Sequence, residues 1–537
     1  MKKSIWGLVV LIATTAACKK GTDDGGTTPT PVPEAVTLKA AATFPIAVAG
    51  SNGAFITNAT SSTVIRNEFN GITFENEMKN SSLVNSAGGF NFTTADAMVA
   101  AAQAANIQVH GHVLAWHSQA QGTYYRSVLS AATPSSVNLA PNPGFESGDA
   151  TSFTNYTTLN SGNPAGTASI TVGSGTAEVR TGTRSMKVVN PTAYATEQWR
   201  VQVTTAPIPL TVGKQYQVSY WVKAAAANGS IRLSTQPSAL YQADQPIGTA
   251  WQQVTWPITA NEAQTRIVFD MGRASNTYYI DDVSVNELVT AGGPTNNYAK
   301  VDSLLKNNIQ QIAGHFKGKV RGWDVINEMF ADGPAGAIRN NTNTANATAN
   351  DIFVWSAYLG RDFGVKAFTY AAQADPTAKL FINEYNLESS TAKLDSLIAY
   401  VAEIRGKGAK VDGIGTQMHI SINTNKDQID THFRKLAATG LLVHVSELDI
   451  GVNTTSATSL TLTDALETTQ AEMYSYVITS YMRNVPKAQR YGVTIWGLLD
   501  DQSWRYRNGA DYPLLFNPAG TKKKAYQAVL SALKSGL

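Results

Sequence analysis

The sequence predicts an α/β fold, a (β/α)8 TIM barrel with an all-β sandwich domain inserted after strand 3. Apolar runs alternate with helical patterns along most of the 537 residues, which is typical of a parallel sheet. Eight such apolar runs occur, the number that closes a barrel. Residues 136–289 interrupt the alternation with a block rich in Thr, Val, Ser, Gly and Tyr that lacks long helical patterns.

The eight expected strands are short and almost wholly apolar, as in strands buried on both faces of a parallel sheet. In chain order they are Ile46–Ala49, Gly71–Phe74, Gln108–Leu114, Val320–Ile326, Lys379–Asn383, Gly413–Met418, Leu442–Ser446 and Tyr491–Trp496. The expected helices are Thr94–Ala105, Lys300–His315, Asp351–Ala374, Ala392–Lys407, Lys426–Ala438 and Leu466–Asn484, with a poorly marked first helix near Ser61–Arg66.

The block at residues 136–289 reads as a separate domain. Its apolar and polar residues alternate in Thr211–Lys223, Trp251–Thr259 and Thr277–Val285, which indicates the short strands of a sandwich. Residues 35–135 and 290–537 remain for the barrel. An insertion at a βα-loop emerges on the face where barrel enzymes build their sites. We therefore expect the inserted domain to have a substrate-related role. A spacer domain is the alternative.

Residues 1–18 are expected to be a lipoprotein signal peptide. Lys2 and Lys3 precede an apolar run, Ile5–Ala13, that is too short to span a bilayer as a mature helix. Small residues then lead to Cys18, the only cysteine, in an arrangement that resembles a bacterial lipobox. Residues 19–34 read as a polar linker. We expect a secreted lipoprotein at the outer membrane or cell surface, facing outward or the periplasm. A plain secretory signal is the alternative.

The composition limits the partners. The formal net charge is only +3, which argues against a nucleic-acid partner and suits an uncharged substrate. The 10 Trp and 21 Tyr offer flat faces that stack on sugar rings, although most are expected in the core. We expect a monomer that contacts a membrane only through lipid at Cys18.

Two glutamates end buried strands. Glu328 follows the fourth expected strand and Glu447 the seventh, and barrel enzymes build their sites at these C-terminal strand ends. A buried carboxylate costs free energy unless it is paired, and two of them are what cleavage of a glycosidic bond requires. Polar or aromatic clusters also end strands two, three, five, six and eight.

A metal site is the rival interpretation of the histidines His110, His112, His117 and His419. His110 and His112 are two apart on one strand and share a face, whereas His117 lies past the strand. We therefore expect no catalytic metal and no catalytic cofactor. The sequence has neither a glycine-rich phosphate loop nor a Gly-x-Ser-x-Gly elbow, so nucleotide and serine-hydrolase chemistry are unsupported.

Eight motifs resemble those of glycoside hydrolase family 10 endo-β-1,4-xylanases, in the same order along both halves of the barrel. They are residues 69–79, 109–119, 317–328, 359–368, 374–386, 413–419, 445–450 and 494–504. Two departures lie in the substrate-side loops. Asn80 stands where the family usually has Trp, and Ala120-Gln121-Gly122 replaces its usual Leu-Pro-x-Trp.

The resemblance implies roles for individual residues. Glu328 would be the general acid/base and Glu447 the nucleophile of a retaining mechanism, with His419, Asp449 and Asn327 as their partners. The residues implied to contact the sugars are Glu75, Asn76, Lys79, His112, Trp116, Gln119, Gln417, Trp496 and Trp504.

The ends of the inserted block, residues 138–146 and 279–285, resemble a carbohydrate-binding module of the family 4/9/22 type. Such modules often hold a structural calcium, for which Glu146 and Asp282 are the candidate ligands. Aromatic candidates for stacking on a glycan are Trp199, Trp221, Tyr241, Trp251 and Trp256.

The resulting hypothesis is endo-hydrolysis of β-1,4-xylosidic linkages in xylan or xylo-oligosaccharides, with a glycan-binding insert. Two alternatives stay open: a β-1,4-glucanase, and a non-catalytic surface glycan-binding protein on a barrel scaffold.

Overall fold

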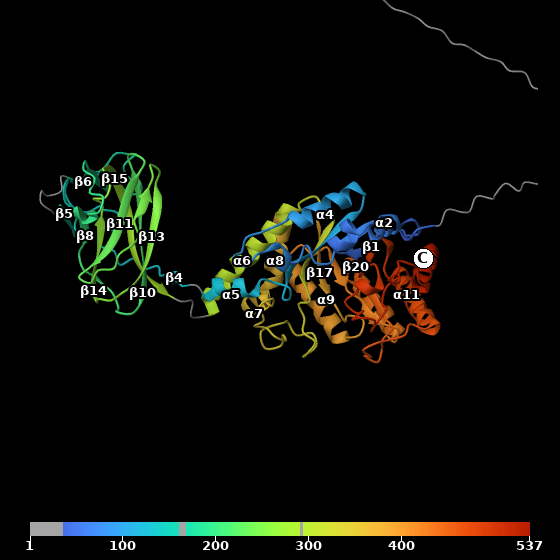
Figure 1. The fold of residues 1–537 in the computed structure, drawn as a ribbon. Helices are drawn as coiled ribbons and strands as arrows, with labels where there is room; N and C mark the ends of the chain where they lie inside the picture. Colours follow the sequence, from blue (N-terminus) through green and yellow to red (C-terminus); the bar gives the residue numbers. More distant parts are fainter. Residues whose placement is uncertain (1–35, 131, 161–167, 290–293, 537) are drawn as a thin grey trace, which may run out of the picture.

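The computed structural model describes residues 36–130, 132–160, 168–289 and 294–536, which form a helix-covered barrel and an all-β domain (Figure 1). The expected signal peptide, the linker and Cys18 lie outside the described residues and stay predictions. Within the described ranges, no helix has the length and apolar character needed to cross a membrane.

Eight parallel strand positions close the barrel, which confirms the predicted fold. Neighbouring strands pair in the order β18-β17-β16-β3-β2-β1-β21-β20-β19, and an additional pairing of β18 with β20 closes the ring. The strands are β1 (Ile46–Gly50), β2 (Gly71–Phe74), β3 (Gln108–Trp116), β16 (Gly322–Asn327), β17 (Lys379–Glu384), β18 (Gly413–Thr416), β19 (His419–Ser421), β20 (Leu442–Gly451) and β21 (Arg490–Ile495).

The sixth strand is broken, whereas the sequence predicted one strand over 413–418. β18 ends at Thr416 and β19 begins at His419, because Met418 adopts a left-handed backbone conformation with φ of 60°. The break is held by its neighbours: Gln417 N donates to the Glu384 carbonyl at 3.0 Å, and Glu447 N donates to the Gln417 carbonyl at 3.1 Å. The turn brings two polar side chains, Gln417 and His419, to the mouth of the barrel.

Helices cover the outside of the barrel (Figure 1). The longer ones are α2 (Ala59–Glu68), α4 (Thr93–Ala104), α5 (Gly122–Ser130), α6 (Pro294–His315), α8 (Asp362–Ala374), α9 (Thr391–Gly406), α10 (Lys426–Ala438), α11 (Asp464–Asn484) and α12 (Lys524–Lys534). Side chains of Asn58, Ser390, Asn425 and Thr463 cap the first turns of α2, α9, α10 and α11.

The single helix predicted over 351–374 is wrong. The segment forms α7 (Trp355–Leu359) and α8, because Gly360 lies between them with φ of 57°, a conformation that ends a helix and that glycine adopts easily.

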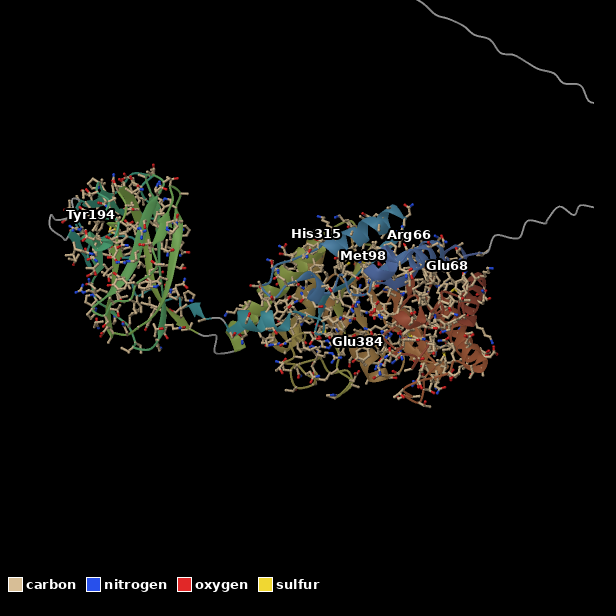
Figure 2. The ribbon with its side chains drawn as sticks, in the orientation of Figure 1. Arg66, Glu68, Met98, Tyr194, His315 and Glu384 are labelled. Carbon is tan, nitrogen blue, oxygen red and sulfur yellow. The ribbon has the colours of Figure 1, made fainter. Side chains whose placement is uncertain are left out.

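Glu68 joins the two ends of the barrel chain (Figure 2). Its carboxylate accepts from the backbone of Leu38 in α1 (Leu38–Ala41) at 3.1 Å and from the Tyr526 hydroxyl of α12 at 2.8 Å. Lys522 adds an ion pair at 2.7 Å. Because a buried carboxylate needs such partners, this cluster holds the first and last helices against α2.

The inserted domain is a sandwich of two antiparallel sheets, as predicted. One sheet has the order β13-β10-β15-β7-β6 with β4 beside β15, and the other the order β12-β11-β14-β8-β5 with β9 beside β14. The strands are β4 (Thr133–Pro134), β5 (Tyr156–Asn160), β6 (Ser169–Gly173), β7 (Ser185–Asn190), β8 (Val201–Thr205), β9 (Ile208–Pro209), β10 (Gln215–Ala224), β11 (Gly229–Gln236), β12 (Gln245–Ile247), β13 (Gln252–Thr259), β14 (Gln264–Asp270) and β15 (Asn276–Val289). Alternate residues of β10, namely Tyr216, Val218, Tyr220 and Val222, are buried between the sheets.

The insertion point lies after the third barrel strand, between α5 and α6. A short antiparallel pairing of Pro134 with Leu288 brings the two connecting segments together. The sandwich has its own apolar core, separate from the core of the barrel.

Asn80 and the segment at Ala120-Gln121-Gly122, the two departures from the family pattern, contact each other. The Asn80 amide donates to the Tyr125 hydroxyl and to Asn308 Oδ1, both at 2.7 Å, and its oxygen accepts from Gln121 N at 2.8 Å. Asn80 is buried, and its bonds to Tyr125 and Asn308 are formed away from water. The residue therefore ties α3 (Asn80–Leu83) to α5 and α6 next to the barrel mouth.

Replacing Asn80 by Ala is expected to lower the free energy of unfolding by about 1–3 kcal/mol, since Tyr125 and Asn308 would lose a buried partner. Urea denaturation of the variant measures the loss. Asn423→Ala, at an exposed position, is the control and should change stability little. An Asn80→Ala variant as stable as the control would contradict this account.

Candidate active site

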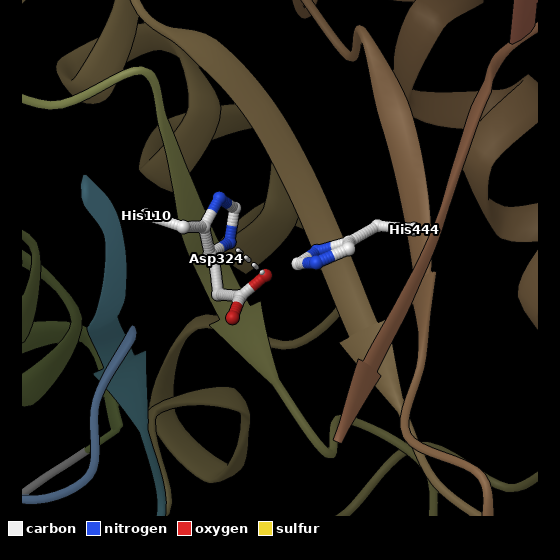
Figure 3. Close-up of side chains that lie close together, drawn as sticks. All are labelled: His110, Asp324 and His444. Atoms are coloured by element: carbon white, nitrogen blue, oxygen red, sulfur yellow. Dashed lines mark ion pairs between the residues drawn. The ribbon is translucent and has the colours of Figure 1, made fainter. Parts of the chain in front are cut away.

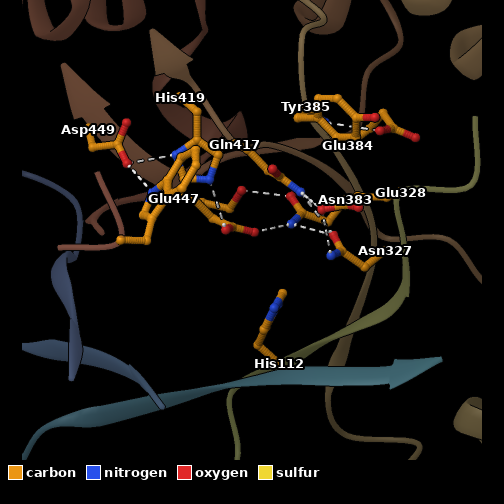
Figure 4. A network of polar contacts seen from close by, with 12 residues as sticks. His112, Asn327, Glu328, Asn383, Glu384, Tyr385, Gln417, His419, Glu447 and Asp449 are labelled. Carbon is orange, nitrogen blue, oxygen red and sulfur yellow. Dashed lines mark hydrogen bonds and ion pairs between the residues drawn. The ribbon is translucent and has the colours of Figure 1, made fainter. Parts of the chain in front are cut away.

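A cavity of about 480 Å³ opens at the C-terminal ends of the barrel strands (Figure 4). Thirteen of its lining residues were singled out in the sequence, and Tyr385 was not. The lining residues are Glu75, Asn76, Lys79, His112, Trp116, Gln119, Asn327, Glu328, Tyr385, Gln417, His419, Glu447, Trp496 and Trp504. Asp449 lies behind this wall, where it bonds His419.

Glu328 follows β16 and is surrounded by neutral donors. The Trp116 indole N–H donates to Oε2 at 2.9 Å, and the Gln417 amide donates to Oε1 at 3.2 Å. The residue has φ of 56°, a conformation that is rare outside glycine and asparagine and that turns the side chain at the strand end. Burial raises the pKa of the Glu328 carboxyl, and the negative charge of Glu447 raises it further.

Glu447 lies within β20 and has donors of a different kind. The Asn383 amide donates to Oε1 at 2.8 Å, and His419 Nε2 lies 3.3 Å from Oε2. Glu447 is only 5% exposed, so these partners replace water as the source of stabilisation. An amide and an imidazolium thus hold the two oxygens of this carboxylate in place.

His419 and Asp449 form a buried ion pair that backs Glu447. His419 Nδ1 lies 2.9 Å from Asp449 Oδ2, which also accepts from the Trp504 indole at 2.8 Å. Arg505 Nε donates to the other oxygen at 2.7 Å. Burial works against a charged imidazole, but Asp449 and Glu447 outweigh it and raise the pKa of His419 to about 10. The imidazolium therefore donates to a carboxylate on each side.

A layer of amides connects the two glutamates. Asn383 Nδ2 donates to Asn327 Oδ1 at 3.0 Å as well as to Glu447, and Gln417 Nε2 donates to Asn327 Oδ1 at 3.2 Å. Ser446 fixes Asn383 by donating to its amide oxygen at 2.6 Å. The sequence placed Asn383 at the end of a strand without giving it a function. Asn383 pairs with Asn327 in the parallel register of β16 and β17. Two asparagines at the ends of neighbouring expected strands were the signal that could have assigned Asn383 to the site.

The opposite wall of the cavity carries buried polar groups from β2 and β3. Burial raises the pKa of the Glu75 carboxyl and lowers the pKa of the Lys79 ammonium, and each partly offsets the other's shift by its charge. The Lys79 ammonium also lies 5.3 Å from the centre of the Trp116 ring. His112 is fixed by Asp324, whose Oδ2 lies 2.9 Å from Nδ1. These groups face the cavity with little water around them, which suits recognition of sugar hydroxyls.

A second network missed by sequence reasoning supports the backbone at Glu328. Arg339 donates to the Glu328 carbonyl at 2.8 Å and to the Tyr385 hydroxyl at 2.8 Å. Next to Tyr385, Lys393 forms an ion pair with Glu384 at 3.0 Å. Burial raises the pKa of Glu384 to about 7 despite this lysine. The arginine comes from a loop without a strand pattern, so nothing in the sequence marked it.

The two expected calcium ligands of the insert have different protein partners. Glu146 accepts from the backbone N–H of Thr183 at 2.9 Å and of Arg184 at 3.1 Å, and Asp282 forms an ion pair with Arg180. Both carboxylates therefore already have protein partners, which a calcium ion would have to displace. Calcium binding by the insert stays a prediction.

Comparison with known families agrees with this geometry. A model of glycosyl hydrolase family 10 matches residues 35–135 and 286–532, well over half of the chain. This chain belongs to glycosyl hydrolase family 10. A carbohydrate binding domain model matches residues 137–275, within the inserted sandwich.

Relatives of this family 10 chain include two much longer proteins. Endo-1,4-beta-xylanase A of Thermoanaerobacterium saccharolyticum is 35% identical over 237 residues, which are 43% of this chain and 18% of that protein. An exoglucanase of Acetivibrio thermocellus is 34% identical over 237 residues, 43% of this chain and 20% of that protein. The matches thus span about a fifth of these relatives.

Solved structures share the fold. A family 10 structure from Paenibacillus barcinonensis has a TM-score of 0.56 at 22% identity and covers 92% of this chain and 96% of its own. A native xylanase from Cellvibrio japonicus has the same TM-score and identity, and covers 93% of this chain and 73% of its own.

The charged state of His419 predicts a pH dependence of stability. Because folding raises its pKa from 6.5 to about 10, its contribution is complete below pH 6.5 and is lost as the pH rises through 10. The unfolding free energy should therefore fall over this window, and His419→Gln should flatten the fall by a few kcal/mol. Urea denaturation across the window measures it.

His432→Gln is the matched control. Burial lowers the pKa of His432 to about 3, so its contribution to the pH dependence of stability falls below pH 6.5. Equal slopes for wild type and His419→Gln would show that His419 is not charged in the folded protein.

Proposed function

We propose that this chain is a retaining endo-β-1,4-xylanase that cleaves internal linkages of xylan or xylo-oligosaccharides. One observation carries the proposal: two buried carboxyl groups line one cavity in opposite environments, Glu328 among neutral donors and Glu447 beside an imidazolium. Opposite environments separate the protonation states of two like groups, which is what an acid and a nucleophile need.

The chemistry follows from these states. Glu328, kept protonated by burial, gives its proton to the glycosidic oxygen of the leaving sugar. Glu447 attacks the anomeric carbon and forms a covalent glycosyl-enzyme. Glu328, now ionised, takes a proton from water as the water attacks the same carbon and releases Glu447. Two inversions leave the anomeric configuration unchanged.

The surrounding side chains would bind and orient the sugar. Asn327 is held by two amide donors, so its position is fixed for a contact with the sugar 2-hydroxyl that strengthens in the transition state. Trp496 and Trp504 wall the cavity, and their rings would stack on the chain and exclude a bulky substituent at sugar C6. This exclusion favours xylan over a β-1,4-glucan.

The inserted domain would hold the enzyme on its polymer. Trp199 and Tyr241 are 41% and 64% exposed, and both lie by the sheet that contains β8 and β11. Arg232 lies 4.8 Å from the centre of the Tyr241 ring and is itself paired with Asp270, which steadies the aromatic face. Exposed rings with polar neighbours suit stacking on a glycan chain. Lipid at Cys18 would keep the enzyme at a membrane surface.

Glu447→Gln and Glu328→Gln should each reduce xylan hydrolysis, measured as reducing ends, by about 100- to 10,000-fold. Glu328→Gln should also remove the basic limb of the pH profile, since that limb reports loss of its proton. Glu388→Gln is the matched control: Glu388 is buried with a raised pKa but lies outside the cavity lining, so activity should persist.

Three outcomes would refute this proposal or part of it. A fully active Glu447→Gln variant would reject the assigned nucleophile. Release of reducing ends only from carboxymethylcellulose would favour the β-1,4-glucanase. The name of the exoglucanase relative supports this alternative. No release from either polymer would leave the non-catalytic glycan-binding protein.

The insert is tested in the Glu447→Gln background, where the polymer stays intact. Trp199→Ala and Tyr241→Ala should weaken retention of the protein by xylan in affinity electrophoresis by about tenfold or more, since stacking on an aromatic ring is lost. Trp251→Ala, beside β13 of the other sheet, is the control and should be retained normally. Unchanged retention of both variants would reject this binding face.

A further inference from the structure

A second polar cluster lies inside the barrel, outside the lining of the cavity that holds Glu328 and Glu447. It consists of His110 on β3, Asp324 on β16 and His444 on β20, which point toward one another across the barrel interior (Figure 3). They are 6%, 1% and 3% exposed. Each offers one ligand atom, and these atoms all lie within 4.8 Å of one another.

One polar atom of each residue lacks a hydrogen-bond partner in the described structure, namely His110 Nε2, Asp324 Oδ1 and His444 Nδ1. The other polar atom of each is paired. His110 Nδ1 lies 3.1 Å from the Tyr491 hydroxyl, His444 Nε2 lies 3.0 Å from Thr494 Oγ1, and Asp324 Oδ2 lies 2.9 Å from His112 Nδ1. Two of these atoms, His110 Nε2 and Asp324 Oδ1, form an ion pair with each other at 3.1 Å, whereas His444 Nδ1 has no partner among the described residues. A buried nitrogen without a partner is costly unless something binds it.

We propose that His110, Asp324 and His444 bind a divalent zinc-class metal ion. Two imidazoles and a carboxylate are a donor set that zinc accepts at about 2.0–2.2 Å, and ligands at such distances in a tetrahedron lie about 3.3 Å apart. His110 Nε2 and Asp324 Oδ1 lie 3.1 Å apart without forming a well-directed hydrogen bond, which is the spacing of two ligands on one ion.

The fourth ligand would be water. A small cavity of about 20 Å³ is lined by His110, His444 and Tyr491, and this is room for one water molecule. The residues that hold the outer ring nitrogens, Tyr491 and Thr494, also fix the ring orientations, as partners of metal-bound histidines usually do.

The ion would be structural. Asp324 lies on β16 four residues before Glu328, which separates the backbone positions of these two residues by about 13 Å. The ion would join three strands of the ring, β3, β16 and β20. Through Asp324 Oδ2 it would also fix the proton of His112 on Nδ1, leaving Nε2 as an acceptor for the cavity.

The guanidinium of Arg321 limits the affinity. Arg321 lines the same small cavity and stacks on Tyr491 at 3.7 Å from the ring centre. A positive charge there opposes the binding of a metal cation. The ion can therefore be lost during purification, and the metal content of the purified protein would not report whether the site binds it. The test therefore adds metal in known amounts.

The full chain is stripped with EDTA, dialysed, and titrated with Zn²⁺ or with Co²⁺, whose visible absorption reports coordination geometry. We expect one ion bound per chain, a tetrahedral Co²⁺ spectrum, and a Tm that rises by several degrees with Zn²⁺, because the ion binds only the folded chain. His444→Gln should lose all three. An octahedral or absent Co²⁺ signal in the wild-type protein overturns the proposal without any variant.

His432→Gln is the matched control. His432 is buried, and its Nε2 lies 3.0 Å from Thr416 Oγ1, just as His444 Nε2 lies 3.0 Å from Thr494 Oγ1. His432 is not part of the metal-binding cluster. This variant should keep the Co²⁺ spectrum and the Zn²⁺-dependent Tm shift. Loss of both in His432→Gln, or their survival in His444→Gln, would mean that the ion binds elsewhere. The cluster would then be a buried His110–Asp324 ion pair.

Discussion

The need to find partners for charge buried at the barrel mouth shapes the rest of this structure. Glu328, Glu447, Asp449 and His419 lie in one desolvated cluster, where an unpaired charge would be strongly destabilising. Their donors come from separate strands. Trp116 is on β3, Asn383 on β17 and Gln417 at the break after β18. Only a closed barrel with a fixed register brings these donors to one point.

The same requirement explains how one fold gives two carboxyl groups different properties. Glu328 receives an indole and an amide, which are neutral and only partly offset the effect of its burial, so its pKa rises. Glu447 receives an amide and the imidazolium of His419, whose charge is in turn secured by Asp449. Arg505 then balances Asp449. Each charged group is thus paired with one that lies further from the cavity. The outermost of them, Arg505, is partly exposed to solvent.

The architecture and most of the cavity wall could be predicted because both depend on regular patterns. Strand-like runs and the polar residue that follows each one are visible in the chain, and parallel strands place those residues at one end of the barrel. The break in strand six was not visible, since Met418 adopts a left-handed conformation that its residue type does not favour. The break in the helix predicted over 351–374 had a signal, Gly360, that the helical pattern on both sides obscured.

Side chains that support the site from irregular segments could not be predicted in the same way. Arg339 binds the Glu328 carbonyl from a loop, and its role depends on a fold of the chain that no periodicity describes. Asn383 had the right position, but an amide at a strand end is as consistent with hydrogen bonding inside the barrel as with a role in the site. In the insert, Glu146 and Asp282 were chosen from the ends of the domain, and the structure gives them separate partners.

The position of the insert shows why a second domain can be accommodated so near the catalytic strand β3. The chain leaves the barrel after α5 and returns at α6, and both helices are anchored by contacts with other barrel residues. Asn308 of α6 donates to the Leu114 carbonyl of β3 at 2.8 Å, and its oxygen accepts from Asn80. Asn80 in turn accepts from Gln121 N, just before α5. Barrel residues alone thus fix the end of β3 that carries Trp116, so the insert can add affinity for polymer without being needed to shape the site.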